Sequence, residues 1–297
     1  LLPLYRRLIR AIREVDPNHV ILLEGVHWAT DFSVFEDFTP KEAADNIVLE
    51  FHKYWSDPDE ESLAPFVETA KRLNVPLWMG EGGENNLQWY TYAFPMYERL
   101  RIGWCFWAYK KMEVPNSPVT FEKPEGWDQI TAYLDGRERP APEAAQAIFD
   151  RFLNCISHGE YHPEIIRALT RRPPLEIPAG AYDAEDIQSR RIAGAVFRRT
   201  SKATLLFVDG HTGEADWRRY GGEAQPEDQR ILLRLSEGDL VGYRLENPEN
   251  QKIRIHVRSY GDGILDVQDL TAGQGLVWIT CKSGTADVES LHITIEE

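Results

Sequence analysis

The chain has 297 residues, with 33 Lys and Arg against 48 Asp and Glu, so its formal net charge is −15. Hydrophobic residues make up 42% and charged residues 27%, which is ordinary for a globular protein and excludes wholesale disorder. A chain this acidic is repelled by phosphate backbones and anionic lipid surfaces, so we expect no nucleic-acid and no membrane partner. The longest apolar runs, such as residues 20–23, are far too short to cross a bilayer.

The first residues predict a helix that ends at Asp16. Apolar residues recur there at steps of three and four, at Leu1, Leu4, Leu8, Ile12 and Val15. Because residue 1 already lies inside this pattern, we expect the chain to be the C-terminal part of something longer, and it shows no signal peptide.

Short apolar strands and amphipathic helices then alternate up to about residue 155. We expect strands at 20–23, 46–51, 75–79 and 102–108, the first of them buried. We expect helices after a capping box at residues 39–42, after the acidic turn at 57–61, and at 87–100 and 142–153. Strands separated by helices pair in parallel, and four such units suit a β/α barrel or a doubly wound sheet.

A change of composition marks a second region. Seven of the nine tryptophans come before residue 130. Proline-rich residues 171–174 and 178–180 predict a linker. Short alternating segments follow at 203–208, 230–235, 240–245, 252–257, 276–280 and 291–295. They predict an antiparallel β-sandwich, so we divide the chain into an α/β domain (1–157), a linker (158–177) and an all-β domain (178–297).

Chemically active side chains gather where the predicted parallel strands end, which is where such sheets carry their working residues. In chain order these are Glu24 with Trp28, His52 with Tyr54, Glu81, and Trp107. Two carboxylates, a His-x-Tyr pair and several tryptophans are what a sugar-cleaving site requires, because glycoside hydrolysis uses two carboxyl groups and aromatic rings stack on pyranose faces.

Four segments along this region resemble one known family. They are residues 16–21 (DPNHVI), 51–54 (FHKY), 75–83 (VPLWMGEGG) and 102–110 (IGWCFWAYK). In this order they resemble the last four β/α units of a family 5 glycoside hydrolase of the cellulase type, over roughly residues 1–155. The resemblance implies the C-terminal part of a (β/α)8 TIM barrel and a retaining mechanism through a covalent glycosyl-enzyme.

The resemblance also implies roles for single residues. Glu81 matches the nucleophile, Tyr54 the tyrosine that hydrogen-bonds it, and His52 the histidine that lines the site. Trp107 matches the tryptophan under the sugar at the cleavage point, and Trp28 resembles a subsite residue.

The proton donor departs from the family pattern. The family's acid/base glutamate follows an asparagine at the end of the fourth strand, and no Asn-Glu pair occupies that position here. We therefore expect a fragment or one part of a split enzyme, whose partner is the missing N-terminal half of the barrel. Glu24 is the in-chain substitute, but retaining chemistry needs carboxyl groups about 5–5.5 Å apart.

Plainer interpretations stand beside these. His52 could be a core histidine with satisfied hydrogen bonds, and we expect Glu84 and Asn85 to cap the next helix. Trp104 and Trp107 should face opposite sides of their strand, one of them packing on a helix.

The three cysteines support no metal site. Cys105, Cys155 and Cys281 form no C-x-x-C pair and are too scattered for a disulfide framework, although one pair could form. Apolar neighbours predict that Cys105 is buried and inert.

The second region resembles a family 6 type carbohydrate-binding module over about residues 178–297. The carrying segments are residues 182–186, 237–243 and 288–293. The resemblance implies a structural Ca²⁺ held by Asp183, Glu185 and Glu289, whose hard oxygen ligands suit calcium. The alternative is that these are solvated charges. Sugar-stacking aromatics are not clearly placed, and this region could merely brace the barrel.

The leading hypothesis is a retaining glycoside hydrolase that cleaves β-1,4-linked glucan or mannan through Glu81, with no cofactor for catalysis. As a fragment alone it is expected to be inactive. The alternative is a non-catalytic carbohydrate-binding protein. The family resemblance implies a secreted or cell-surface location, because polysaccharides do not enter cells.

Overall fold

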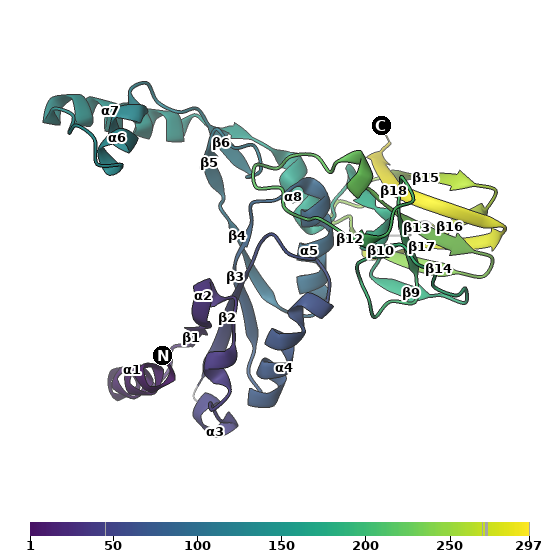
Figure 1. Ribbon diagram of the computed structural model, residues 1–297, viewed down its shortest axis with the longest axis horizontal. Coiled ribbons are helices and arrows are strands. Elements are labelled where there is room, and N and C mark those ends of the chain that lie inside the picture. The colour runs from purple at the N-terminus through teal and green to yellow at the C-terminus, as the bar shows by residue number, and fades with distance from the viewer. Residues whose placement is uncertain (45, 269, 271–272, 297) are drawn as a thin grey trace.

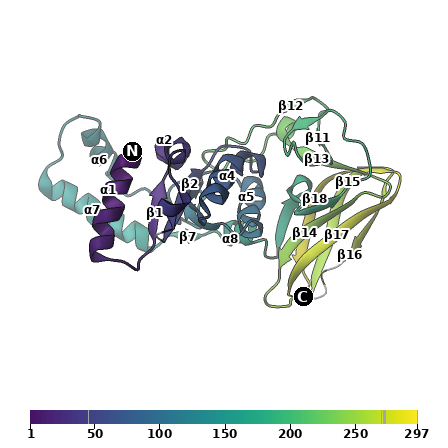
Figure 2. The ribbon, with the colours of Figure 1, turned by 90° about the horizontal axis from the view of Figure 1, so that it is seen from below.

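A computed structural model describes residues 1–44, 46–268, 270 and 273–296. A parallel sheet with its helices occupies the middle of the molecule, an arm with two helices projects from one side, and stacked strands form the other end (Figures 1 and 2). None of the described helices is both long enough and apolar enough to span a membrane.

The central sheet confirms the predicted parallel strands. It consists of β1 (Ile21–Glu24), β2 (Ile47–Lys53), β3 (Leu77–Gly83) and β4 (Gly103–Trp107), in the order β1-β2-β3-β4. Every neighbouring pair is parallel, so the four carboxyl ends lie along one edge of the sheet.

Helices cover one face of this sheet. Phe51 of β2 stacks on Phe66 of α4 (Ala64–Leu73), with ring centroids 4.6 Å apart. Trp104 of β4 packs on Phe94 of α5 (Leu87–Arg99) at 4.8 Å, which is the helix contact expected for one of the two tryptophans. The α4 helix begins later than its acidic turn predicted, because a 3-10 turn at Glu61–Leu63 precedes it.

No described helix covers the opposite face, which we call the open face. Leu22 of β1 is 45% exposed, so the strand predicted to be buried is buried on one side only. Cys105 is exposed as well, and the prediction of a buried thiol is wrong, because alternate residues of β4 point away from α5. All three cysteines are free.

The apolar stripe of the first helix is also uncovered. α1 (Leu2–Val15) forms as predicted, but it buries Leu2 and Ile9. The residues of the predicted stripe are exposed, with Leu8 at 46% and Val15 at 86%. Periodicity located the helix correctly, and tertiary packing selected a different side of it.

Short elements fill the connections. α2 (Val26–Ala29) and a 3-10 turn (Ser33–Phe35) follow β1. α3 (Pro40–Ala43) has the predicted capping box, in which Thr39 and Glu42 exchange both hydrogen bonds. The hydrogen bond from Arg6 is the main cause that lowers the pKa of Glu42 to about 2.

The arm was only partly predicted. It carries α6 (Trp127–Leu134) and α7 (Pro142–Ser157), whose Trp127 and Phe152 rings stack at 4.7 Å. A small sheet joins the arm to the molecule, made of β5 (Lys110–Met112), β6 (Val119–Phe121) and β7 (Glu160–Tyr161).

The segment expected to be a linker is structured. α8 (Pro163–Thr170) packs against α5, and β8 (Leu175–Pro178) pairs with β18. Residues 158–177 therefore hold both regions together by regular structure and do not separate them.

The C-terminal region consists of two antiparallel sheets. The first contains β11 (Thr204–Phe207), β13 (Ile231–Ser236), β18 (Thr285–Ile295) and β15 (Ile253–Gly261), with β8 attached to β18. The second contains β16 (Ile264–Gln268), β17 (Gln274–Ser283), β14 (Leu240–Glu246) and β9 (Ala184–Asp186). Short pieces complete it: β10 (Ala195–Val196), β12 (Gly213–Glu214) and 3-10 turns at Ala179–Ala181 and Glu227–Gln229. Buried residues of both sheets, such as Leu233 and Ile279, belong to one core.

Candidate active site

Glu81 lies near the end of β3, beside the end of β2. The Tyr54 hydroxyl donates a hydrogen bond of 2.7 Å to Glu81 Oε2. His52 Nδ1 lies 3.5 Å from the same oxygen. An irregularity in the β2–β3 register sets His52 opposite Glu81, so the structure brings together the carboxylate, the imidazole and the phenol that the sequence singled out.

The Tyr54 phenol keeps its proton in this arrangement. Burial, and then the hydrogen bond to Glu81, raise the pKa of Tyr54 well above its usual value. Tyr54 is therefore a fixed donor that orients the Glu81 carboxylate and leaves the other oxygen, Oε1, free of this bond.

Sequence reasoning missed Glu50, a second carboxylate in contact with His52. Its Oε1 lies 3.6 Å from His52 Nε2, so the imidazole stands between two carboxylates. Burial, and then the charge of Glu24, raise the pKa of Glu50. The spacing of two residues between Glu50 and His52 in one strand was the available signal, because such residues share a face.

Gly80 makes room for that carboxylate. A Cβ atom at position 80 would lie 1.7 Å from Glu50 Oε1 and 2.4 Å from its Cδ. A larger residue would displace the Glu50 head group from His52, so the glycine before Glu81 has a steric role.

Glu24 joins this group from β1. It pairs in register with Glu50, and donor atoms of Glu24, Glu50 and His52 lie within 4.8 Å of one another. Among the described residues these three are close enough to hold a metal ion. Glu24 thus lies in the site beside Glu50, whereas the contacts of the Glu81 carboxylate described above are with Tyr54 and His52.

A cavity of about 890 Å³ opens beside Glu81. Its aromatic walls come from Trp28, Tyr54, Trp55 and Phe66, with Glu84 and His52 among the polar residues at its edge. Trp28, in α2, is 87% exposed. The size is at the upper end of the range for small-ligand sites, and the mixture of rings and carboxylates suits a sugar polymer.

Trp107 is at the same edge of the sheet. It ends β4, pairs in register with Gly83 and is 48% exposed, although it does not line the cavity around Trp28. A Cβ at position 83 would lie 2.2 Å from the Trp107 carbonyl oxygen, so this close strand approach requires glycine.

This geometry coincides with a match to a family model. Residues 1–113 match the cellulase family, glycosyl hydrolase family 5. No curated protein matches the chain. We refer to residues 1–113 below as the family 5 segment.

Solved structures with some similarity are glycoside hydrolases. They include the endoglucanase Cel5A of Pseudomonas stutzeri, with 22% identity, a TM-score of 0.33, and coverage of 36% of this chain and 41% of that one. The catalytic domain of Thermobifida fusca endoglucanase Cel5A has 24% identity and a TM-score of 0.29, covering 36% and 39%. The catalytic domain of a mannanase from Streptomyces sp. SirexAA-E has 18% identity and a TM-score of 0.32, covering 39% and 40%. This chain thus spans less than half the length of each.

The family 5 segment also buries a lysine next to the cavity. Lys53 is 4% exposed and donates hydrogen bonds to the hydroxyls of Ser56 (2.8 Å) and Ser62 (2.7 Å). Burial lowers its pKa to about 8. Burial, and then the charge of Asp59, raise the pKa of Asp57 to about 6.

Glu84 and Asn85 do not cap α5 as expected. The N-cap is Asn86, whose side chain accepts from the Trp89 backbone N–H. Glu84 instead pairs with Lys111 at 2.7 Å, and the buried Asn85 amide donates to the Trp217 carbonyl at 2.6 Å.

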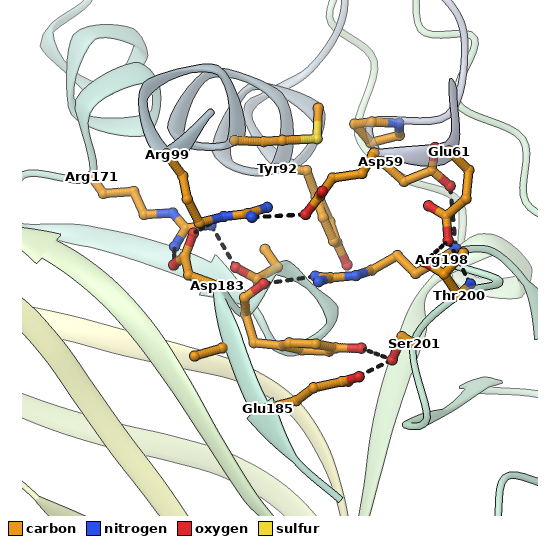
Figure 3. Close-up of a pocket in the computed structure, with 16 residues that line it drawn as sticks. Asp59, Glu61, Tyr92, Arg99, Arg171, Asp183, Glu185, Arg198, Thr200 and Ser201 are labelled. Carbon is orange, nitrogen blue, oxygen red and sulfur yellow. Dashed lines mark hydrogen bonds and ion pairs between the residues drawn. The ribbon is translucent and has the colours of Figure 1, made fainter. Parts of the chain in front are cut away.

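The expected calcium ligands are held by other partners. Asp183 and Glu185 line a pocket of about 190 Å³ between the two regions (Figure 3). The Arg171 guanidinium binds Asp183, and the Ser201 hydroxyl donates to Glu185 at 2.6 Å. Glu289 lies in the other sheet and binds Arg230 and the Tyr260 hydroxyl. The structure therefore does not bring the three carboxylates together, and arginines compensate the charge of Asp183 and Glu289.

Proposed function

We propose that the family 5 segment carries the nucleophile side of a retaining glycoside hydrolase site, acting on β-1,4-linked glucan or mannan. The observation that carries this proposal is the Glu81 carboxylate, held by the Tyr54 hydroxyl at 2.7 Å beside an open aromatic cavity. The match of residues 1–113 to family 5 supports it.

In the proposed reaction Glu81 attacks the anomeric carbon of a bound sugar. The glycosidic bond breaks, the leaving oxygen takes a proton from a general acid, and a glycosyl ester forms on Glu81. Water then hydrolyses the ester and restores the carboxylate. Tyr54 and His52 position Glu81, and the aromatic walls bind the pyranose faces.

The general acid is a separate part of the proposal. The open face exposes apolar side chains, and both edge strands, β1 and β4, lack a further partner among the described residues. We propose that polypeptide completing a (β/α)8 barrel covers this face and brings the acid carboxyl. Glu24 is the in-chain alternative for that role.

Trapping of the ester tests the nucleophile without needing the general acid. A 2-deoxy-2-fluoro glycoside with a dinitrophenolate leaving group departs without protonation and leaves a stable ester. We expect 2,4-dinitrophenyl 2-deoxy-2-fluoro-β-cellobioside, or the corresponding mannoside, to add one glycosyl group to the peptide that contains Glu81, as measured by mass spectrometry.

The controls separate the carboxylate from its surroundings. Glu81→Gln should abolish labelling, whereas Glu84→Gln, three residues further along the chain, should retain it. Hydrolysis of an activated cellobioside should fall at least about a thousandfold in Glu81→Gln. Labelling that persists in Glu81→Gln, or no labelling of the wild type by either glycoside, contradicts the proposal.

A non-catalytic carbohydrate-binding protein is the second candidate. The exposed rings of Trp28, Trp55 and Trp107 favour it, because they offer stacking surfaces whether or not a bond is cleaved. Binding to insoluble glucan or mannan without labelling would support it. We also propose that the protein acts outside the cell, because polysaccharide polymers do not enter cells. The two C-terminal antiparallel sheets are proposed to form a β-sandwich that accompanies the site.

A further inference from the structure

A segment of the C-terminal region reaches the loops at the strand ends of the family 5 segment. Residues 215–225 accept hydrogen bonds there from three asparagine amides. Asn85 Nδ2 donates to the Trp217 carbonyl at 2.6 Å, and Asn86 Nδ2 to the Glu223 carbonyl at 3.1 Å. Asn116 Nδ2 donates to the Tyr220 carbonyl at 2.9 Å.

These contacts fix the segment in one conformation. The three asparagines are at most 3% exposed, so their amides depend on these carbonyls for hydrogen bonds. Gly222 has φ +89°, and a Cβ there would lie 2.7 Å from Asn116 Cβ. Trp217 is 4% exposed and packs on Tyr92 of α5 with ring centroids 5.1 Å apart. The segment is thus anchored on both sides of Tyr220.

The anchored segment holds the Tyr220 ring against Trp55. Their centroids are 4.7 Å apart and their planes meet at 59°, so the rings form an open V. Both remain accessible, with Tyr220 53% and Trp55 43% exposed. Because the backbone carbonyl of Tyr220 makes the anchoring hydrogen bond and its ring is exposed, the ring itself is not needed for the core.

The same rings connect to the nucleophile. Trp55 lines the cavity beside Glu81, and its Nε1 donates to the Glu84 carbonyl at 3.0 Å, which fixes the indole. The Tyr54 ring lies 5.5 Å from the Trp55 ring, and its hydroxyl binds Glu81. An aromatic row therefore runs from Glu81 through Tyr54 and Trp55 to Tyr220.

We propose that Tyr220, supplied by the C-terminal region, forms with Trp55 a distal subsite for a β-linked oligosaccharide whose reacting sugar lies at Glu81. This rests on the proposed function. Pyranose rings present apolar C–H faces to such aromatic surfaces, while their hydroxyls stay in water. The C-terminal region then contributes directly to substrate binding, beyond supporting the family 5 segment.

The test is length-dependent binding to the full chain carrying Glu81→Gln, which removes turnover. Affinities for cellobiose, cellohexaose and mannohexaose are measured by calorimetry. Tyr220→Ala should weaken binding of the better hexasaccharide about tenfold, as the loss of one aromatic contact does, and leave the disaccharide unchanged. Tyr220→Phe should bind like the parent, because the ring is retained.

Tyr260→Ala is the matched control. Tyr260 is 49% exposed, lies in the same region on β15 and donates to Glu289 instead of facing the cavity. It should not affect binding of any length. Equal hexasaccharide affinity in Tyr220→Ala and Tyr260→Ala, an equal loss for both lengths, or no binding of any of these sugars overturns the subsite. Labelling of Glu81 is independent of these outcomes and tests the proposed function alone.

Discussion

The two regions differ in how completely they cover their apolar side chains. Among the described residues, the large apolar side chains exposed beyond residue 190 are Ile192, Tyr220, Tyr260 and Ile264. All others precede residue 162, including the whole α1 stripe and the two tryptophans that line the cavity, Trp28 and Trp55. Both sheets of the C-terminal region contribute buried residues to the core, whereas α4 and α5 cover a single face of the parallel sheet (Figure 1).

That contrast coincides with the position of the candidate site. Glu24, Glu50, His52 and Glu81 gather at the face and edge of the sheet that helices leave uncovered. Buried carboxylates cost free energy unless they are paired, and a substrate must be able to approach them. In the proposed function, the uncovered sheet carries the chemistry, and its exposed apolar surface is the cost of leaving the site open to substrate.

The sharpest way to break this arrangement is at the junction of the two regions. Arg171 is 2% exposed and binds Asp183, which is 5% exposed at its side chain. Arg171→Met should lower the free energy of unfolding by about 3–5 kcal/mol, because it leaves a buried carboxylate without its partner. Urea denaturation measures the change.

The neighbouring arginine provides the control for that variant. Arg172 pairs with Glu246 at 3.3 Å, and its side chain is 48% exposed. Arg172→Met should cost less than about 1 kcal/mol, since exposed ion pairs contribute little. Similar losses for the two variants would show that Arg171 carries no special role at the junction.

A pair of leucine truncations tests the difference in cover directly. Leu291 of β18 is fully buried, and Leu22 of β1 is 45% exposed. Leu291→Ala should destabilise the chain by about 2–5 kcal/mol through a cavity. Leu22→Ala should cost less than about 1 kcal/mol, because little buried area is lost. If thermal unfolding gives Leu22→Ala the larger loss, the open face is covered in solution.

The smallest effect is a pH dependence from Lys53. Its folded pKa of about 8 lies below the ordinary lysine value, so the unfolded chain binds more protons between those pH values. The destabilisation from charged Lys53 therefore fades as pH rises. Between pH 8 and 10 the unfolding free energy of the wild type should rise by about 1–2 kcal/mol relative to Lys53→Met.

Lys71→Met, which removes an exposed positive charge from α4, controls for overall charge. A wild-type profile parallel to that of Lys53→Met would mean that Lys53 reaches water.

Local patterns in the sequence located much of the sheet and of the site. Apolar runs between helix signals identified all four parallel strands, and the positions after them singled out His52, Tyr54 and Glu81, which the structure brings together. The capping box of α3 is equally local and was confirmed. These features succeed because each is encoded within a few residues.

The failures involve contacts between distant residues. The exposure of Cys105 and of the α1 stripe depends on which faces other elements cover, which periodicity does not specify. α8 was taken for a linker because prolines flank it, although its apolar side packs on α5. Tyr220 meets Trp55 across 165 positions of sequence (220 − 55), and no local motif marks such a pair.

The asparagine contacts to residues 215–225 have a consequence for engineering. A shortened version ending near Thr170, or a chimera with another accessory module, would leave three buried amides without hydrogen-bond acceptors. It would also expose Tyr92 of α5. The C-terminal region therefore cannot simply be exchanged for another domain. A replacement domain would have to supply backbone carbonyls that accept the same three hydrogen bonds.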